Sequence, residues 1–386
     1  MTVPAAPPAT EHTGPVRDRS PLPDVLRGLA LAGILVVNMQ DFAGFSVWRQ
    51  NGLDGAAQFI TDVLANGRFI SIFAMLFGWG AAGLLARQSA GVFVKRHLIL
   101  LLIGSLHFIL VWHGDIISNY ALLGLVMLLL VNLGARALVG LAAALGGWWL
   151  FTGVTAAMSY FNGLAVPRSA NLPDIESGMT YLQIMTGRAH EFVPDLIGGS
   201  IYNGPWLVAL FCLGAAAQRT GLLNRPQEHV PLLQRLAVWG SVLGIISGVW
   251  LAYLNTRADF ANALLGIPVR MGGGLAGALG YVGIIGLLTV QGQLGWWKHF
   301  ANSGRMAMSN YLAQSLVMTS VFYPYAGAQW GQNGGKWGAA STLALALAFV
   351  ALQVWLSGLI VRRYGSGPLE KLVRRLVYGP VKEKNA

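Results

Sequence analysis

Two histidines and an aspartate lie close together between residues 107 and 115 of this chain. An imidazole held by a carboxylate keeps one tautomer and becomes more basic, which suits it to general-base catalysis. We therefore take His107, Asp115 and His113 as candidate catalytic residues. The alternative is a structural histidine with an ordinary hydrogen-bond partner, and an aspartate that only caps the helix after it.

Asp24 and Arg27 stand three residues apart, so they share one face of any helix that contains them. A guanidinium just inside a membrane is well suited to hold a phosphate or a carboxylate. We treat the two residues as a candidate binding site for an anionic co-substrate. The alternative is a capped helix start from which Arg27 extends to the membrane surface.

Further polar side chains interrupt two otherwise apolar stretches of the chain, at 38–41 and 302–315. A polar residue inside a membrane either lines a cavity or forms a hydrogen bond with a neighbouring helix. The residues that we predict to line a substrate cavity are Asn38, Asp41, Arg305, Asn310 and Gln314. Interhelical hydrogen bonding is the alternative for the last two. If they line the cavity, Asn310 or Gln314 would donate a hydrogen bond to a developing oxyanion.

The composition of the chain indicates which elements position these residues. Of 386 residues, 55% are hydrophobic and 11% are charged, whereas soluble domains carry about 25% charged residues. This composition excludes a disordered chain and a coiled coil. Because Cys212 is the single cysteine, an internal disulfide and a cysteine-based zinc site are also excluded, and we predict no metal site. The net charge of +11 is spread between apolar segments, which argues against nucleic-acid binding.

A helix that crosses a bilayer needs about 20 mainly apolar residues. Ten segments meet this requirement, and they predict an all-α, polytopic integral membrane helix bundle with about ten transmembrane helices. The segments lie at about 25–45, 68–86, 97–113, 115–132, 136–158, 197–217, 234–254, 271–291, 304–323 and 338–360. The third and fourth are so close that they form a helical hairpin. The sixth contains Gly204-Pro205, where a break in the helix is left open.

The distribution of positive charge predicts the orientation of this bundle. With ten spans, nineteen of the 26 Lys and Arg residues fall on the side of the N-terminus. Positive charge concentrates on the cytoplasmic side, so both termini are predicted to be cytoplasmic. We expect a mobile cytoplasmic tail over 1–20, a transmembrane domain over 21–363, and an amphipathic basic tail over 364–386 that anionic lipid attracts.

Two of the outer connections are longer than a turn requires, at 46–67 and 159–196. In the first, apolar residues recur at helical spacing, which predicts a short amphipathic helix that lies at the membrane interface. In the second we expect a helix near 177–190.

Several stretches of the sequence resemble the YeiB-like family of uncharacterised bacterial inner-membrane proteins. Together they extend over nearly the whole chain, and about 133–300 is the least similar region. The stretches are DVLRGLALAGILVVNM at 24–39, RFISIFAMLFGWG at 68–80, RHLILLLIGSLHFILVWHGDIISNYALLG at 96–124, NSGRMAMSNYLAQS at 302–315 and GPLEKLVRRLVYG at 367–379. The resemblance implies a multi-pass protein of the bacterial inner membrane.

The Asp-x-x-Arg-Gly motif at 24–28 is more distantly similar to the opening of transmembrane acyltransferases of the heparan glucosaminide acetyltransferase type. That resemblance implies transfer of an acyl group from a cytoplasmic acyl-CoA to an acceptor across the membrane, with Arg27 on the CoA side. The acetyltransferase has its catalytic histidine after this first span, but here no histidine occurs between His12 and His97. His107 or His113 would therefore have to take that role.

The function that we predict is transfer of an acyl group to an extracytoplasmic or lipid-borne hydroxyl or amine, on a sugar, a lipid or a peptide. Acyl-CoA is the expected co-substrate, no cofactor is expected to be tightly bound, and assembly into homo-oligomers is left open. One alternative is a small-solute transporter, which ten spans and polar groups at mid-depth also suit. Another is a binding or assembly subunit, in which His107 and Arg27 would matter only for stability.

Overall fold

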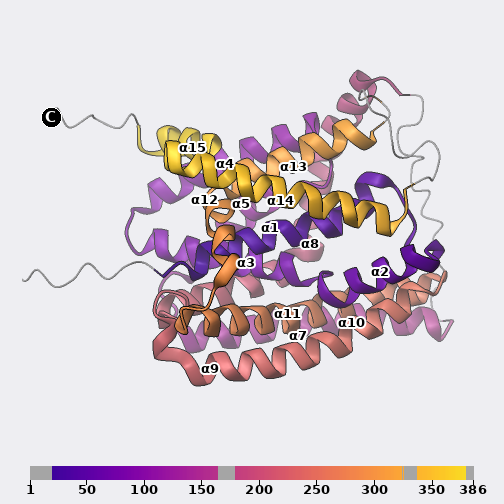
Figure 1. Ribbon diagram of the computed structural model, residues 1–386, viewed down its shortest axis with the longest axis horizontal. Helices are drawn as coiled ribbons and strands as arrows, with labels where there is room; N and C mark the ends of the chain where they lie inside the picture. Colours follow the sequence, from indigo (N-terminus) through magenta and orange to yellow (C-terminus); the bar gives the residue numbers. More distant parts are fainter. Residues whose placement is uncertain (1–19, 164–178, 324, 326–336, 380–386) are drawn as a thin grey trace, which may run out of the picture.

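The computed structural model describes residues 20–163, 179–323, 325 and 337–379, and every regular element among them is helical (Figure 1). The predicted all-α fold is therefore confirmed. The α-helices are α1 (Leu22–Ala43), α2 (Gly52–Leu64), α3 (Arg68–Leu85), α4 (Ala90–Leu110), α5 (Ile117–Gly124), α6 (Met127–Leu130), α7 (Ala135–Phe161), α8 (Tyr181–Thr220), α9 (Val230–Arg235), α10 (Ser241–Asn255), α11 (Phe260–Val290), α12 (Phe300–Arg305), α13 (Ala307–Phe322), α14 (Ala339–Tyr364) and α15 (Pro368–Tyr378). Of the predicted tail over 1–20, only residue 20 is described, whereas the predicted tail over 364–386 contains α15 and lies outside the described residues only from 380 onwards.

Eight helical segments in the described part of the chain are long and apolar enough to cross a membrane. Each of the ten predicted spans falls on one helix or on consecutive short helices. The two predicted spans that are not among the eight are 115–132, which forms α5 and α6, and 304–323, which ends in the 16-residue α13. The chain is therefore a multi-pass membrane protein, and its outward-facing apolar side chains contact lipid.

The sixth predicted span belongs to α8, a single helix of 40 residues. It begins with a capping box between Thr180 and Gln183, and it continues through Pro194 and Pro205 without a break. The predicted helix near 177–190 is thus the beginning of α8. At 1.5 Å per residue the helix is about 60 Å long, so it extends beyond a hydrocarbon core of about 30 Å.

The helices are arranged in layers (Figure 1). Helices α7, α9, α10 and α11 lie along one side of the molecule, and α13, α14 and α15 lie along the opposite side. Helices α1 and α3 run between these layers, and the beginning of α1 and the short α15 lie at the same end of the bundle. That shared end is where the predicted anion-binding residues of α1 are found.

Helix α1 packs very closely against α12. A Cβ atom on Gly28 would lie 2.1 Å from the carbonyl oxygen of Phe300, and one on Gly304 would lie 1.9 Å from the carbonyl oxygen of Asp24. Only glycine permits backbones to approach this closely. The contact brings the first turn of α1 beside the end of α12, and with it Arg27 near Arg305.

Helix α2 occupies the predicted amphipathic segment, but its polar side faces the bundle instead of water. Asp62 is 1% exposed, and its carboxylate accepts hydrogen bonds from Gln58, Asn66 and Asn255. The buried Arg68 donates to three carbonyl groups, those of residues 62, 66 and 244. This network joins α2, α3 and α10, while large apolar side chains of α2 face outward. In a lipid environment, polar groups are stabilised by turning inward.

Candidate functional site

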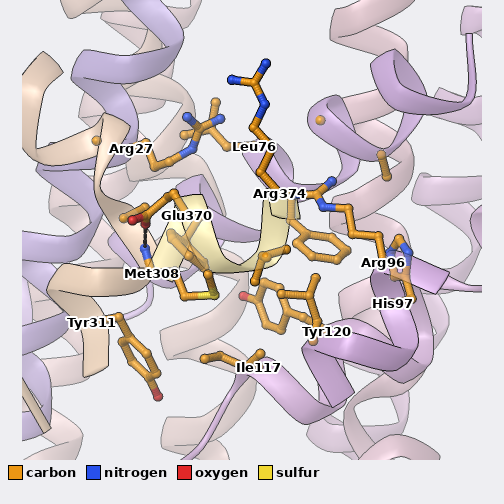
Figure 2. Close-up of a pocket in the computed structure, with 18 of the residues that line it drawn as sticks. Arg27, Leu76, Arg96, His97, Ile117, Tyr120, Met308, Tyr311, Glu370 and Arg374 are labelled. Atoms are coloured by element: carbon orange, nitrogen blue, oxygen red, sulfur yellow. Dashed lines mark hydrogen bonds between the residues drawn. The ribbon is translucent and has the colours of Figure 1, made fainter. Parts of the chain in front are cut away.

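A cavity of about 450 Å³ lies near the end of the bundle that holds α15 (Figure 2). Residues of α1, α3, α4, α5, α12, α13 and α15 line it, and most of them are apolar. Among the described residues, four arginines line this cavity, namely Arg27, Arg96, Arg305 and Arg374. Figure 2 shows Arg27, Arg96 and Arg374 towards one end of the cavity, and Ile117 and Tyr311 at the other. The cavity is therefore cationic at one end and apolar at the other.

Arg27 comes from the second turn of α1. Its Nη1 donates a hydrogen bond of 2.9 Å to Oδ1 of Asp24, and its side chain is 23% exposed. The predicted pair therefore forms, but only Arg27 is among the cavity-lining residues. Asp24 orients the guanidinium, and Arg27 lies where an anion in the cavity would meet it.

Three cavity residues were not selected from the sequence: Arg96, His97 and Tyr120. His97 is 1% exposed, and Tyr120 is 3% exposed. From the sequence, Arg96 is only one of the positive charges on the cytoplasmic side, and His97 is the first residue of the predicted span 97–113. The signal that was available is that Arg96 directly precedes an apolar span and His97 begins it, as Arg27 lies at the start of the first span.

Helix α15 closes the cationic end of the cavity. Oε1 of Glu370 accepts hydrogen bonds from the backbone N–H groups of Met308 (2.8 Å) and Ser309 (3.1 Å), and Oε2 accepts one from the Ser309 hydroxyl (2.5 Å). A carboxylate at the N-terminus of a helix is stabilised by the helix dipole, so Glu370 fixes α15 to α13. One turn later, Arg374 and its neighbours Val373 and Val377 form a wall of the cavity.

His107 and Asp115 form a buried hydrogen-bonded pair. Nδ1 of His107 lies 2.9 Å from Oδ1 of Asp115, and their side chains are 1% and 0% exposed. Oδ2 of Asp115 accepts a hydrogen bond of 2.7 Å from the backbone N–H of Ser118. The aspartate therefore accepts a hydrogen bond from the histidine and also caps the first turn of α5. The hairpin of α4 and α5 brings the two side chains together.

The hydrogen bond to Asp115 determines which ring nitrogen of His107 carries the proton. Because a carboxylate only accepts, Nδ1 carries a proton, and Nε2 of the neutral ring has a lone pair. Nε2 is buried and has no hydrogen-bond partner among the described residues. An imidazole in this state can accept a proton from a substrate that reaches it.

Tyr311 separates His107 from the cavity. Its ring centre lies 5.3 Å from that of His107, and it lines the apolar end of the cavity together with Ile116 and Ile117. The Tyr311 hydroxyl donates to the carbonyl of Gly114 (3.1 Å) and accepts from the N–H of Ile116 (3.3 Å). His107 is thus one side-chain layer beyond the apolar end, and it does not itself line the cavity.

Asp41 and His113 lie close to Trp112. Oδ2 of Asp41 accepts a hydrogen bond of 2.8 Å from Nε1 of Trp112 and lies 3.5 Å from Nε2 of His113. Trp112 is 3% exposed, and its ring centre is 6.5 Å from that of His107. The Trp112 side chain therefore packs near His107, and neither Asp41 nor His113 is among the residues that line the cavity.

Three further residues that we expected to line a cavity, Asn38, Asn310 and Gln314, are not among the residues that line this one. The Asn310 amide donates to Ser303 and to the Ser357 hydroxyl of α14. The Gln314 amide donates to Gln353 of α14 (2.8 Å) and to a backbone carbonyl of α1. The side chains of Asn310 and Gln314 therefore form interhelical hydrogen bonds, the alternative to cavity lining. Of the predicted lining residues, only Arg305 faces the cavity.

Within the described part of the chain, no three His, Cys, Asp or Glu side chains are grouped so that they could hold a metal ion. The polar groups of the cavity are guanidinium, imidazole and phenol groups, together with the carboxylate that holds α15. Guanidinium groups bind phosphates and carboxylates. The arrangement therefore suits an anion with an attached apolar or weakly polar arm.

Comparison with known proteins gives relatives along almost the whole chain. Residues 217–380 match the family described as "Protein of unknown function (DUF418)". The chain is 30% identical to "Uncharacterized protein YxaH" of Bacillus subtilis, over 92% of this chain and 93% of that protein. It is 26% identical to "Uncharacterized protein YeiB" of Escherichia coli, over 92% of this chain and 94% of that protein.

Proposed function

The chain belongs to the YeiB-like family, which carries the DUF418 region, and we propose that it is a transmembrane acyltransferase. The donor is an acyl-CoA, and the acceptor is a hydroxyl or an amine on a lipid-borne or extracytoplasmic sugar, lipid or peptide. The protein works in the bacterial inner membrane, with both termini in the cytoplasm. The distribution of Lys and Arg supports this orientation. In this orientation the cationic end of the cavity faces the cytoplasm, where acyl-CoA is found.

The observation that carries the proposal is the position of the His107–Asp115 pair. It lies beyond the apolar end of a cavity whose other end holds four of the described arginines. A donor whose phosphates bind the arginines can extend its arm along the apolar walls towards Tyr311. Its reactive end then comes to the layer that separates the cavity from Nε2 of His107.

The reaction requires that the Tyr311 side chain moves aside, so that an acceptor in the cavity reaches Nε2 of His107. Nε2 of His107 accepts the proton of the acceptor hydroxyl or amine, and the freed electron pair attacks the thioester carbonyl carbon. The resulting tetrahedral intermediate collapses, the carbon–sulfur bond breaks, and the CoA thiolate takes the proton back from His107. Asp115 holds the imidazole and stabilises its cationic form. Asn310 and Gln314 form interhelical hydrogen bonds. We therefore do not propose that either of them donates a hydrogen bond to the oxyanion.

The test uses the purified full chain in lipid nanodiscs, with acetyl-CoA as donor and a bacterial lipid extract as acceptor. Release of the CoA thiol reports transfer. We expect His107→Gln to lower the rate by about 10²–10⁴-fold, because a general base contributes that much. As a matched control we choose His229→Gln, because His229 does not line the cavity and its imidazole bonds the backbone carbonyl of Thr220 at the end of α8.

The control variant is expected to keep the wild-type rate. Unchanged CoA release in His107→Gln would remove His107 from the mechanism. Solute uptake into proteoliposomes without any acyl donor, together with no CoA release by the wild type, would replace the proposal by the transporter interpretation.

A further inference from the structure

Two buried polar groups in the wall of the cavity have no hydrogen-bond partner among the described residues. They are Nε2 of His97 on α4 and the hydroxyl of Tyr120 on α5. Both side chains are almost completely buried, at 1% and 3% exposed. A buried polar atom without a partner destabilises a protein. Two such atoms in one cavity wall indicate that the partner is a ligand.

The chemical state of His97 follows from its other nitrogen. Nδ1 of His97 lies 2.8 Å from the carbonyl oxygen of Phe93, and a carbonyl only accepts. Nδ1 therefore carries the proton, and Nε2 presents a lone pair. A Cβ atom on Gly124 of α5 would lie 2.8 Å from this Nε2, so only glycine fits against the imidazole on that side.

His97 and Tyr120 border the same part of the cavity. Both rings contact the ring of Phe77, with centre-to-centre distances of 5.8 Å for His97 and 5.3 Å for Tyr120. Figure 2 shows His97 next to Arg96, and Tyr120 between the arginines and Ile117. The two groups therefore lie between the cationic end and the apolar end.

We propose that His97 and Tyr120 form a polar subsite that binds an amide in the arm of the ligand. An amide offers an N–H to the lone pair of His97 and a carbonyl oxygen to the hydroxyl of Tyr120, so it complements both groups. This inference rests on the proposed function, and it narrows the donor class. The donor is a thioester whose amide-bearing arm separates its phosphates from its acyl group, not a lipid phosphate with a purely hydrocarbon chain.

The experiment measures equilibrium binding to the full chain in nanodiscs with two probes. CoA carries phosphates and an amide-bearing arm, whereas adenosine 3′,5′-bisphosphate carries phosphates but no arm. Tyr120→Phe removes only the hydroxyl. His97→Asn keeps an N–H that can reach the Phe93 carbonyl and removes Nε2, whereas His97→Gln restores a polar group near the position of Nε2.

We expect Tyr120→Phe and His97→Asn each to weaken CoA binding by about three- to tenfold, the effect of one hydrogen bond, and His97→Gln to recover part of the loss. Binding of the bisphosphate should not change in any variant. Tyr281→Phe is the matched control, because its hydroxyl bonds the Leu64 carbonyl (2.8 Å) away from the cavity. It should lower the melting temperature and leave CoA binding unchanged, whereas Tyr120→Phe should not lower it.

The outcomes separate the two proposals. If both probes bind and the variants bind CoA as tightly as the wild type, the subsite is wrong and the arginine site remains. If neither probe binds the wild type, the proposed donor is wrong. If Tyr120→Phe lowers CoA and bisphosphate binding equally, the hydroxyl supports the cavity walls and does not bind an amide, which also overturns the subsite.

Discussion

The contact between Glu370 and the beginning of α13 provides a quantitative prediction. Three hydrogen bonds end on its carboxylate, two from backbone N–H groups and one from the Ser309 hydroxyl. Glu370→Gln keeps one oxygen for the backbone donors but removes the charge at the helix N-terminus. A charge in a partly buried position of this kind contributes up to about 2 kcal/mol. We therefore expect α15 to be docked less firmly, by about 1–2 kcal/mol.

Hydrogen–deuterium exchange of residues 368–378, followed by mass spectrometry, measures this change. A loss of 1–2 kcal/mol corresponds to about 5- to 30-fold faster exchange of the amides that α15 protects. Binding of CoA should weaken as well, because Val373, Val377 and Arg374 form a wall of the cavity. Unchanged exchange in Glu370→Gln would refute the view that this carboxylate holds α15.

The control for this experiment is Glu228→Gln. Glu228 also pairs within its own connection, with Arg225 at 3.2 Å, but both side chains are nearly half exposed. An exposed pair contributes little to stability, so we expect no change in the exchange of α15 or in CoA binding. Faster exchange in both variants would point to a general effect of lost surface charge.

Three further predictions concern the His107–Asp115 pair, the buried network around Arg68, and the close contact between α1 and α12. Because His107 and Asp115 act as one unit, the double variant His107→Gln/Asp115→Asn should transfer acyl groups no more slowly than the slower single variant; multiplied losses would contradict this. Arg68→Lys cannot reach all three carbonyl groups, so the melting temperature should fall by several degrees while CoA binding persists, and an unchanged melting curve would argue against the network. Gly28→Ala should destabilise strongly, because its Cβ would lie 2.1 Å from a carbonyl oxygen, whereas Gly147→Ala, with no atom nearby, should not; equal unfolding temperatures would contradict the close contact.

Most of the fold could be predicted from the apolar segments alone, because spacing and length are properties of the sequence. The break that was left open at Pro205 did not occur. Membrane helices tolerate proline when neighbouring groups satisfy the freed carbonyl, and α8 continues through two prolines. Helix α2 was predicted, but the side to which its polar residues face was not. In water the polar residues of an amphipathic helix face out, whereas here Asp62 faces a polar network inside the bundle.

The candidate site was predictable where its parts lie close in sequence. His107 and Asp115 are eight residues apart across a tight hairpin, so the chain has little choice but to bring them together. Arg96, Tyr120 and Arg374 line one cavity only after α4, α5 and α15 assemble. No local sequence pattern predicts that these helices come together. Asn310 and Gln314 fitted two interpretations, and the rotation of α13 against α14 decided between them.

The central claim is that the cationic cavity holds an anionic acyl donor, and binding of acetyl-CoA to the purified full chain tests it most directly. We expect saturable binding by the wild type, and at least about tenfold weaker binding by Arg27→Gln, since a charge-assisted contact is lost. Arg136→Gln is the control, because Arg136 is exposed at the beginning of α7 and does not line the cavity. No binding by the wild type, or equal affinities in all three proteins, would contradict the account.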